Sequence, residues 1–362
     1  MSRFSNKAYL QEIAAQLPPE LAFPIDRPQE WPRWRQALRA KVAELLGGIS
    51  PPRAEPETRV LERRHEDGYG REKIVVRSRE GMEVPAYLLT PVDERGDGGQ
   101  RRAVLCLHGH GHGKDDVVGD PGEGTEEERA RRAAWIAEHN YAYARRFARM
   151  GFVVLAPEAR GFGERAEGSE QGCYIPGVIS LFLGLPIPGQ RLRDDMSALD
   201  YLCSLPNVDA ARVGCVGLSE GGRRTLYLAA MDDRVKAAVI SGYYSTLKGA
   251  IREWDKLSGW DICNYVPGLL RYADYTDLAA LIAPRPLLVE SATDDPLYDQ
   301  CAVDEALEVT ARTYAAHGAA EHFDADIFTG GHRWSGRKSF AWIDRWLPAS
   351  PATDRRGDAD SG

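Results

Sequence analysis

A serine held between glycines is the first group in this sequence that could do chemistry. The residues Gly217-Leu218-Ser219-Glu220-Gly221 form a G-x-S-x-G pattern between an apolar run at 213–216 and a stretch of helical pattern at 220–231. A tight turn from strand to helix exposes the serine hydroxyl at the edge of a sheet, and glycines tolerate the crowding of such a turn. The start of the helix also offers free backbone N–H groups to a developing negative charge. The pattern therefore predicts that Ser219 is a nucleophile.

A nucleophilic serine needs a general base and an acid that orients this base. His332 follows two glycines after the last apolar run, 325–328, and we predict that it is the base. Three carboxylates compete for the role of the acid. Glu290 ends the apolar run at 286–289, and Asp294 and Asp295 follow in an acidic turn. We favour Asp295, because its loop is the one best placed to face His332, and Asp294 is the next candidate.

The order serine, aspartate, histidine resembles that of the α/β-hydrolase superfamily over about residues 57–348. Three further motifs support the resemblance: Leu107-His108-Gly109-His110-Gly111, Glu158-Ala159-Arg160-Gly161-Phe162-Gly163 and Ala283-Pro284-Arg285-Pro286-Leu287-Leu288. Together they look like the dienelactone-hydrolase and acetyl-xylan-esterase-like branch, whose members have an N-terminal helical extension and act as serine esterases.

The resemblance implies an oxyanion hole made by the backbone N–H groups of Glu220 and His110, although the sequence alone does not choose among the amides of residues 108–111. Glu220 departs from the uncharged residue that many relatives carry, which leaves the acyl-group preference open. We expect its side chain to lie at the helix start, one turn from Arg223 or Arg224, in a structural role.

Other functions use the same residues differently. A C–C bond hydrolase or a thioesterase would employ the same triad. A metal-dependent hydrolase could use His108, His110 and His112, but Lys114 stands where a cation would be repelled. A non-catalytic binding protein would be expected to lack one of the triad residues. We therefore expect an ester hydrolase that needs no metal and no cofactor.

Aromatic and charged residues near the predicted sheet edge are candidates for the walls of a substrate pocket. The candidates are Arg160, Tyr174, Tyr243 and Trp260. Aromatic rings with polar tips suit a sugar or an aromatic ester, and Arg160 could bind an acidic group. A structural role for Arg160, holding neighbouring loops, is the stronger expectation.

Short, continuous apolar runs that alternate with helical patterns predict an α/β fold around a mostly parallel sheet with helices on both faces. Three strands at 59–64, 72–76 and 83–89 predict an antiparallel start. Parallel strands are expected at 103–107, 152–156, 213–216, 235–240, 286–289 and 325–328. Helices are expected at 126–150, 191–205, 220–231, 303–317 and 338–347.

The chain divides into three predicted parts. Residues 1–55 form an N-terminal helical extension, in which Trp34, Leu38 and Val42 recur at helical spacing. Residues 57–348 form the catalytic domain, with a cap-like insertion at 243–283. Residues 351–362 are polar and predict a flexible tail.

The composition of the chain limits the classes of molecule that it is expected to bind. The 362 residues include 54 acidic and 46 basic side chains, a net charge of −8, which argues against nucleic acid as a partner. No apolar run is long enough to span a bilayer, and the first residues do not resemble a signal peptide. The six cysteines show no metal-ligand spacing, and reduced thiols are expected. These observations predict a cytoplasmic enzyme for a small-molecule ester, with possible self-association through the N-terminal helices.

Overall fold

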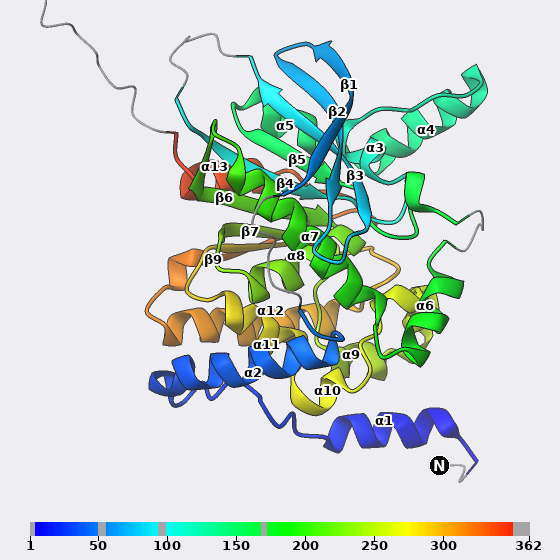
Figure 1. The fold of residues 1–362 in the computed structure, drawn as a ribbon. Helices are drawn as coiled ribbons and strands as arrows, with labels where there is room; N and C mark the ends of the chain where they lie inside the picture. Colours follow the sequence, from blue (N-terminus) through cyan, green and yellow to red (C-terminus); the bar gives the residue numbers. More distant parts are fainter. Residues whose placement is uncertain (1–3, 50–55, 93–98, 168–171, 350–362) are drawn as a thin grey trace, which may run out of the picture.

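The computed structural model describes residues 4–49, 56–92, 99–167 and 172–349, which build a nine-stranded sheet with helices on both faces (Figure 1). The strand order is β1-β2-β3-β5-β4-β6-β7-β8-β9. The pairs from β1 to β3, and β3 with β5, are antiparallel, and every later pair is parallel. The predicted fold class is confirmed. The strands are β1 (Thr58–Glu66), β2 (Tyr69–Arg77), β3 (Glu83–Pro91), β4 (Arg101–Leu107), β5 (Val153–Pro157), β6 (Val208–Leu218), β7 (Val235–Ser241), β8 (Leu287–Ala292) and β9 (Phe323–Phe328).

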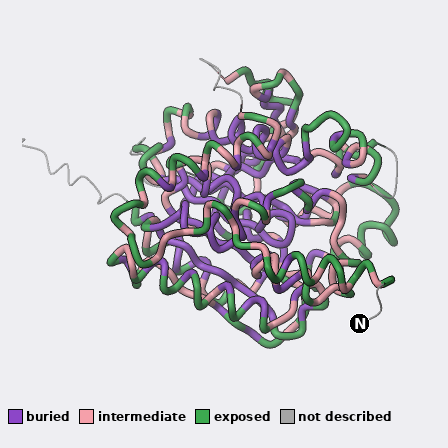
Figure 2. The backbone as a smooth tube through the Cα atoms, turned by 90° about the horizontal axis from the view of Figure 1, so that it is seen from below, coloured by how far each residue is buried: buried purple, intermediate pink, exposed green. Residues whose placement is uncertain are grey.

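Two apolar cores lie on the two faces of this sheet, because the central strands are buried on both sides. Helices α2, α7, α8, α11 and α12 contribute to one core, and α3, α5 and α13 contribute to the other. Figure 2 shows the buried residues running through the middle of the molecule beneath exposed outer turns. The helices are α1 (Asn6–Gln16), α2 (Trp31–Leu45), α3 (Lys114–Val118), α4 (Glu126–Glu138), α5 (Tyr143–Arg149), α6 (Tyr174–Phe182), α7 (Ile187–Ser204), α8 (Glu220–Met231), α9 (Leu247–Arg252), α10 (Leu269–Tyr272), α11 (Tyr275–Ile282), α12 (Gln300–Ala316) and α13 (Ser339–Trp346).

The helix predicted from the spacing of Trp34, Leu38 and Val42 is α2, and these three side chains are buried in the first core. The indole N–H of Trp31 donates to the carbonyl oxygen of Ala280 in α11. Helix α2 therefore covers the outer side of the layer formed by α11 and α12, as Figure 1 shows at the bottom of the molecule. The linker predicted around residues 50–56 lies mostly outside the described residues, as does the predicted tail at 351–362.

The single helix predicted over 126–150 is wrong, because the chain forms α4 and α5 with a break between them. Asn140 and Ala142 adopt positive φ angles of 51° and 65°, which an α-helix cannot contain. The break lets the Asn140 side-chain amide donate to the carbonyl oxygens of Trp334 and Ser335. Helix α4 thus points away from the sheet, whereas α5 packs against the sheet.

The predicted insertion at 243–283 contains α9, α10 and short 3₁₀ turns, but its last element belongs to the core. All eight residues of α11 are buried, and the helix packs against α8 and α12. The apolar stretch from 174 onward, for which the sequence predicted no helix, forms α6, and α7 begins at Ile187 rather than at 191. Pro188 is compatible with this earlier start because it occupies the first turn, where its missing N–H has no partner to lose.

None of the helices in the described part of the chain is long and apolar enough to cross a membrane.

Candidate active site

Ser219 lies in a strained turn between β6 and α8. Its φ and ψ angles are 58° and −123°, a conformation that a residue with a side chain rarely adopts. The flanking glycines are required by close packing. A Cβ atom on Gly217 would lie 2.3 Å from the carbonyl carbon of Gly221, and one on Gly221 would lie 1.9 Å from the carbonyl oxygen of Leu107. Such strain persists only where the surroundings enforce it, and it is typical of functional sites.

His332 and Asp295 are joined by a short hydrogen bond. The Nδ1 atom of His332 lies 2.6 Å from Oδ2 of Asp295. The other carboxylate oxygen, Oδ1, accepts a hydrogen bond from the backbone N–H of Leu297 at 2.9 Å, so the carboxylate is fixed at both oxygens. Asp295 is buried, and its neighbour Asp294 is exposed. The structure therefore brings His332 together with Asp295 and not with Asp294.

The imidazole of His332 lies at the same edge of the sheet as the serine turn. His332 Nε2 is buried and has no hydrogen-bond partner among the described residues. The imidazole packs against Gly242, where a Cβ atom would lie 3.1 Å from its Cε1 atom. Gly242 directly follows Ser241, whose carbonyl oxygen accepts from the backbone N–H of Ser219 at 2.8 Å. The nitrogen that would have to take a proton is thus unpaired, and its ring lies at the sheet edge where Ser219 follows β6 and Gly242 follows β7.

The loop after β4 closes over the serine from the other side. A Cβ atom on Gly109 would lie 2.7 Å from the carbonyl oxygen of Leu218 and 3.0 Å from Cβ of Ser219. The next residue, His110, therefore lies near Ser219, as the predicted oxyanion hole requires. The backbone N–H of His110 donates to no described residue, and neither does that of Glu220 at the start of α8. Two unpaired amides at this place are the feature that stabilises an oxyanion.

The Glu220 side chain is fully buried between two arginines. It forms ion pairs with Arg191 of α7, at 2.5 Å, and with Arg223 one turn along α8. Burial alone would raise the pKa of the Glu220 carboxyl, but the positive charges of Arg223 and Arg191 outweigh this effect and hold the pKa far below its usual range. The expected contact of Glu220 with an arginine one turn along the helix is confirmed for Arg223. Arg224 pairs instead with Asp195, and Arg191 is a partner that the sequence pattern did not reveal.

The three alternating histidines do not form one cluster. Nε2 of His108 accepts from the backbone N–H of Ala159, and Nδ1 of His112 contacts Asp116. His110 faces Asp261 and Cys263. Lys114 is buried, and its Nζ pairs with the carboxylate of Glu158 at 3.1 Å. The geometry does not support a metal held jointly by His108, His110 and His112.

Glu290 takes no part in the contacts of His332. Its buried carboxylate accepts from the backbone N–H groups of Ser335 and Gly336, which belong to the loop that carries His332. Burial raises the pKa of this carboxyl to about 7, and the neighbouring charge of Asp326 adds to the effect. Glu290 therefore braces the loop.

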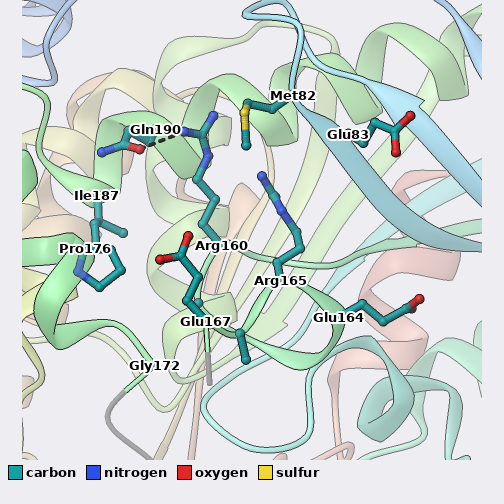
Figure 3. Close-up of a pocket in the computed structure, with 12 residues that line it drawn as sticks. Met82, Glu83, Arg160, Glu164, Arg165, Glu167, Gly172, Pro176, Ile187 and Gln190 are labelled. Carbon is teal, nitrogen blue, oxygen red and sulfur yellow. Dashed lines mark hydrogen bonds between the residues drawn. The ribbon is translucent and has the colours of Figure 1, made fainter. Parts of the chain in front are cut away.

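A cavity of about 500 Å³ lies between the β2–β3 turn, the loop after β5 and the start of α7 (Figure 3). Arg160 lines it, but Asp194, Glu80 and Gln190 already occupy its guanidinium group. This matches the expectation that Arg160 holds neighbouring loops. Ser219, Asp295 and His332 are not among the residues that line this cavity.

The other pocket candidates lie in different surroundings. Tyr243 is 2% exposed, and its hydroxyl forms a hydrogen bond with Tyr275, so it belongs to the core. Trp260 packs on Tyr243 and lines a separate cavity on the side of α9 and α10. Tyr174 is 49% exposed on α6. The structure therefore does not bring the four candidates together around one substrate.

Comparisons with known proteins agree with this architecture. The model of a family described as the Abhydrolase family matches residues 2–345. The chain is 27% identical over 321 residues to the putative hydrolase YtaP of Bacillus subtilis, covering 86% of this chain and 100% of that protein.

Solved structures with a similar fold include two proteins described as esterases. A putative acetyl xylan esterase of Bacteroides fragilis superposes with a TM-score of 0.73 at 19% identity, covering 90% of this chain and 82% of the other. A glucuronoyl esterase of Solibacter usitatus superposes with a TM-score of 0.66 at 18% identity, covering 91% of this chain and 98% of the other. At these identities the likeness concerns the fold.

Proposed function

Since this chain belongs to the Abhydrolase family, we propose that it hydrolyses carboxylic esters through an acyl-enzyme formed on Ser219. One observation carries the proposal. A serine in a strained strand-to-helix turn shares a sheet edge with a histidine whose Nδ1 lies 2.6 Å from a buried carboxylate and whose Nε2 has no partner among the described residues. This is the arrangement of a nucleophile, a general base and an orienting acid.

The residues would act in two steps. Neutral His332 takes the Ser219 proton on Nε2 as the serine Oγ attacks the ester carbonyl, and then gives the proton to the leaving alcohol. Water attacks the acyl-enzyme in the second step, again with His332 as the base. Asp295 keeps the other proton on Nδ1 and stabilises the imidazolium that forms. The backbone N–H groups of His110 and Glu220 hold the negative charge on the carbonyl oxygen.

The buried pairing of Glu220 fits this mechanism. An unpaired carboxylate beside the oxyanion would oppose the developing negative charge, but Arg191 and Arg223 neutralise it. The α8 start can therefore present its amides to the oxyanion although it carries an acidic residue.

For the substrate, we propose a short-acyl or carbohydrate-linked ester. The names of the structural neighbours, acetyl xylan esterase and glucuronoyl esterase, support this class. A thioesterase or a C–C bond hydrolase with the same triad is the alternative function.

A substrate panel tests the proposal. The purified chain and its Ser219→Ala variant are assayed with nitrophenyl acetate, acetylated xylo-oligosaccharides, a methyl glucuronate ester and an acyl thioester. We expect release of acetate or methanol by the unmodified chain only, and faster than release of thiol. If the chain turned over the thioester alone, it would be a thioesterase and not an ester hydrolase. Equal turnover by Ser219→Ala would refute the role of the serine.

A further inference from the structure

We propose that His110, Cys173, Asp261 and Cys263 form a binding site for one zinc ion. The donor atoms of these four side chains all lie within 4.8 Å of one another. They come from three separate segments: the loop after β4, the residue before α6, and the 3₁₀ turn at Ile262–Asn264 with the residue that precedes it. The ligand set differs from the alternating histidines that the sequence suggested, because it contains only His110 of those three.

Two of the separations between the four ligand atoms match a tetrahedral ion. Bonds of about 2.0–2.3 Å to nitrogen, oxygen and sulfur place neighbouring ligand atoms of a tetrahedral zinc about 3.3–3.8 Å apart. Nε2 of His110 lies 3.4 Å from Oδ2 of Asp261 and 3.6 Å from Sγ of Cys263. The remaining pairs require side-chain adjustment of about an ångström to reach the same range.

The donor types favour zinc over other common ions. Two thiolates, an imidazole and a carboxylate form a mixed set that suits Zn²⁺, whereas Mg²⁺ and Ca²⁺ prefer oxygen alone. Four protein ligands leave no open position for a water nucleophile, so the ion would be structural rather than catalytic.

The charge around the site also allows an ion to enter. Arg191 and Arg223 carry two positive charges, and Glu220 and Asp261 carry two negative charges. Binding of Zn²⁺ breaks the two S–H bonds of Cys173 and Cys263, forms two Zn–S bonds and releases two protons. Nε2 of His110, which faces Asp261 and Cys263, also binds zinc without a proton, so the two positive charges of the ion are offset by protons that leave the ligands. Arg191 already donates to Sγ of Cys173 at 2.8 Å, the kind of outer contact that orients a metal-bound thiolate.

Access and structural need both support the site. The side chains of His110 and Asp261 are 40% and 30% exposed, so an ion can reach the two buried thiols from solvent. Helix α6 has only Gly177 and Ser180 buried, while Ile175, Ile179 and Phe182 are exposed. Helix α6 therefore has little apolar anchoring, and a zinc ion bound by Cys173 would tie its first turn to the loop that carries His110.

The test measures metal binding by the full chain, without reference to hydrolysis. The reduced, metal-free chain receives one equivalent of Zn²⁺ or Co²⁺ and is examined by native mass spectrometry and visible absorption. We expect one zinc ion per chain, and Co²⁺ bands typical of a tetrahedral ion with thiolate ligands. Cys263→Ser should weaken zinc binding at least about 10-fold, because losing a ligand costs no less than losing a supporting contact.

Cys301→Ser is the matched control, since Cys301 is a free and exposed cysteine on α12. It should bind zinc like the unmodified chain. Absence of zinc binding, Co²⁺ spectra without thiolate bands, or equal zinc affinity in Cys263→Ser and Cys301→Ser would overturn the proposal. The Co²⁺ spectrum of the unmodified chain decides the matter even if Cys263→Ser does not fold. A negative result would leave the proposed hydrolysis untouched.

Discussion

Replacing Asp295 by asparagine tests how His332 is oriented. The carboxylate accepts from Nδ1 of His332 at 2.6 Å and from the backbone N–H of Leu297 at 2.9 Å. Asparagine has nearly the same shape, and its oxygen can still accept from Leu297. Its NH₂ group would then face His332, whose Nδ1 must become an acceptor. The imidazole proton moves to Nε2, and this nitrogen can no longer take the proton of Ser219.

The size of the effect follows from this loss of the productive tautomer. The equivalent change in serine proteases lowers turnover about 10⁴-fold, which corresponds to roughly 5 kcal/mol of transition-state free energy. Asp294→Asn is the matched control, because it removes the same charge one residue away. Asp294 is exposed, and its backbone N–H, which bonds to the carbonyl oxygen of Gly330, is unchanged by the substitution. We expect Asp294→Asn to stay within about twofold of the unmodified chain.

The assay compares kcat/KM of the two variants on one nitrophenyl ester, with circular dichroism to establish that both are folded. A loss confined to Asp295→Asn is the expected outcome. If Asp294→Asn were the crippled variant, the acid would be one residue earlier. If both variants kept full activity, the proposed coupling between His332 and a carboxylate would be refuted.

Three further substitutions probe the supporting structure. Glu220→Gln leaves two buried arginines without their counter-charge and should lower the free energy of unfolding by about 3–5 kcal/mol in urea titrations. Glu62→Gln, at a half-exposed ion pair on β1, should lower it by less than about 0.5 kcal/mol, and equal losses in the two variants would contradict the role of the buried pair. Gly221→Ala places a methyl group 1.9 Å from the carbonyl oxygen of Leu107, so we expect loss of soluble folded protein or of activity; an active variant of unchanged melting temperature would show that this contact is not limiting. Burial raises the pKa of Glu290 to about 7, so the contribution of this group to stability is fully present below the unfolded pKa near 4.5 and is lost as the pH rises through 7. Glu290→Gln should flatten this part of the stability–pH curve, whose slope for one proton is at most about 1.4 kcal/mol per pH unit. An unaltered curve would refute the assignment.

Local patterns predicted the parts of this molecule that depend on neighbouring residues. The glycines beside Ser219 were predictable, because the crowding that requires them arises within one turn between a strand and a helix. The helix through Trp34 was predictable from its periodicity. The break between α4 and α5 was not, because Asn140 and Ala142 adopt left-handed conformations without a glycine or proline to mark them.

Contacts between distant segments account for what the sequence left open. The choice between Asp294 and Asp295 depends on which side chain faces a loop nearly forty positions later. Cys173 and Cys263 are separated by 90 positions, and only the packing of α6 against the turn at Ile262–Asn264 places them together. Arg191 approaches Glu220 because α7 packs on α8. No spacing rule in the sequence predicts these contacts between distant residues.

Covalent capture of Ser219 tests whether this serine is the nucleophile. The native chain is incubated with a fluorophosphonate, digested and sequenced by mass spectrometry, beside the Ser219→Ala variant. We expect one phosphonyl group per chain, attached to Ser219, with none on the variant and no further hydrolysis of esters by the labelled chain. Labelling of another residue, or equal labelling of the variant, would contradict this role of Ser219.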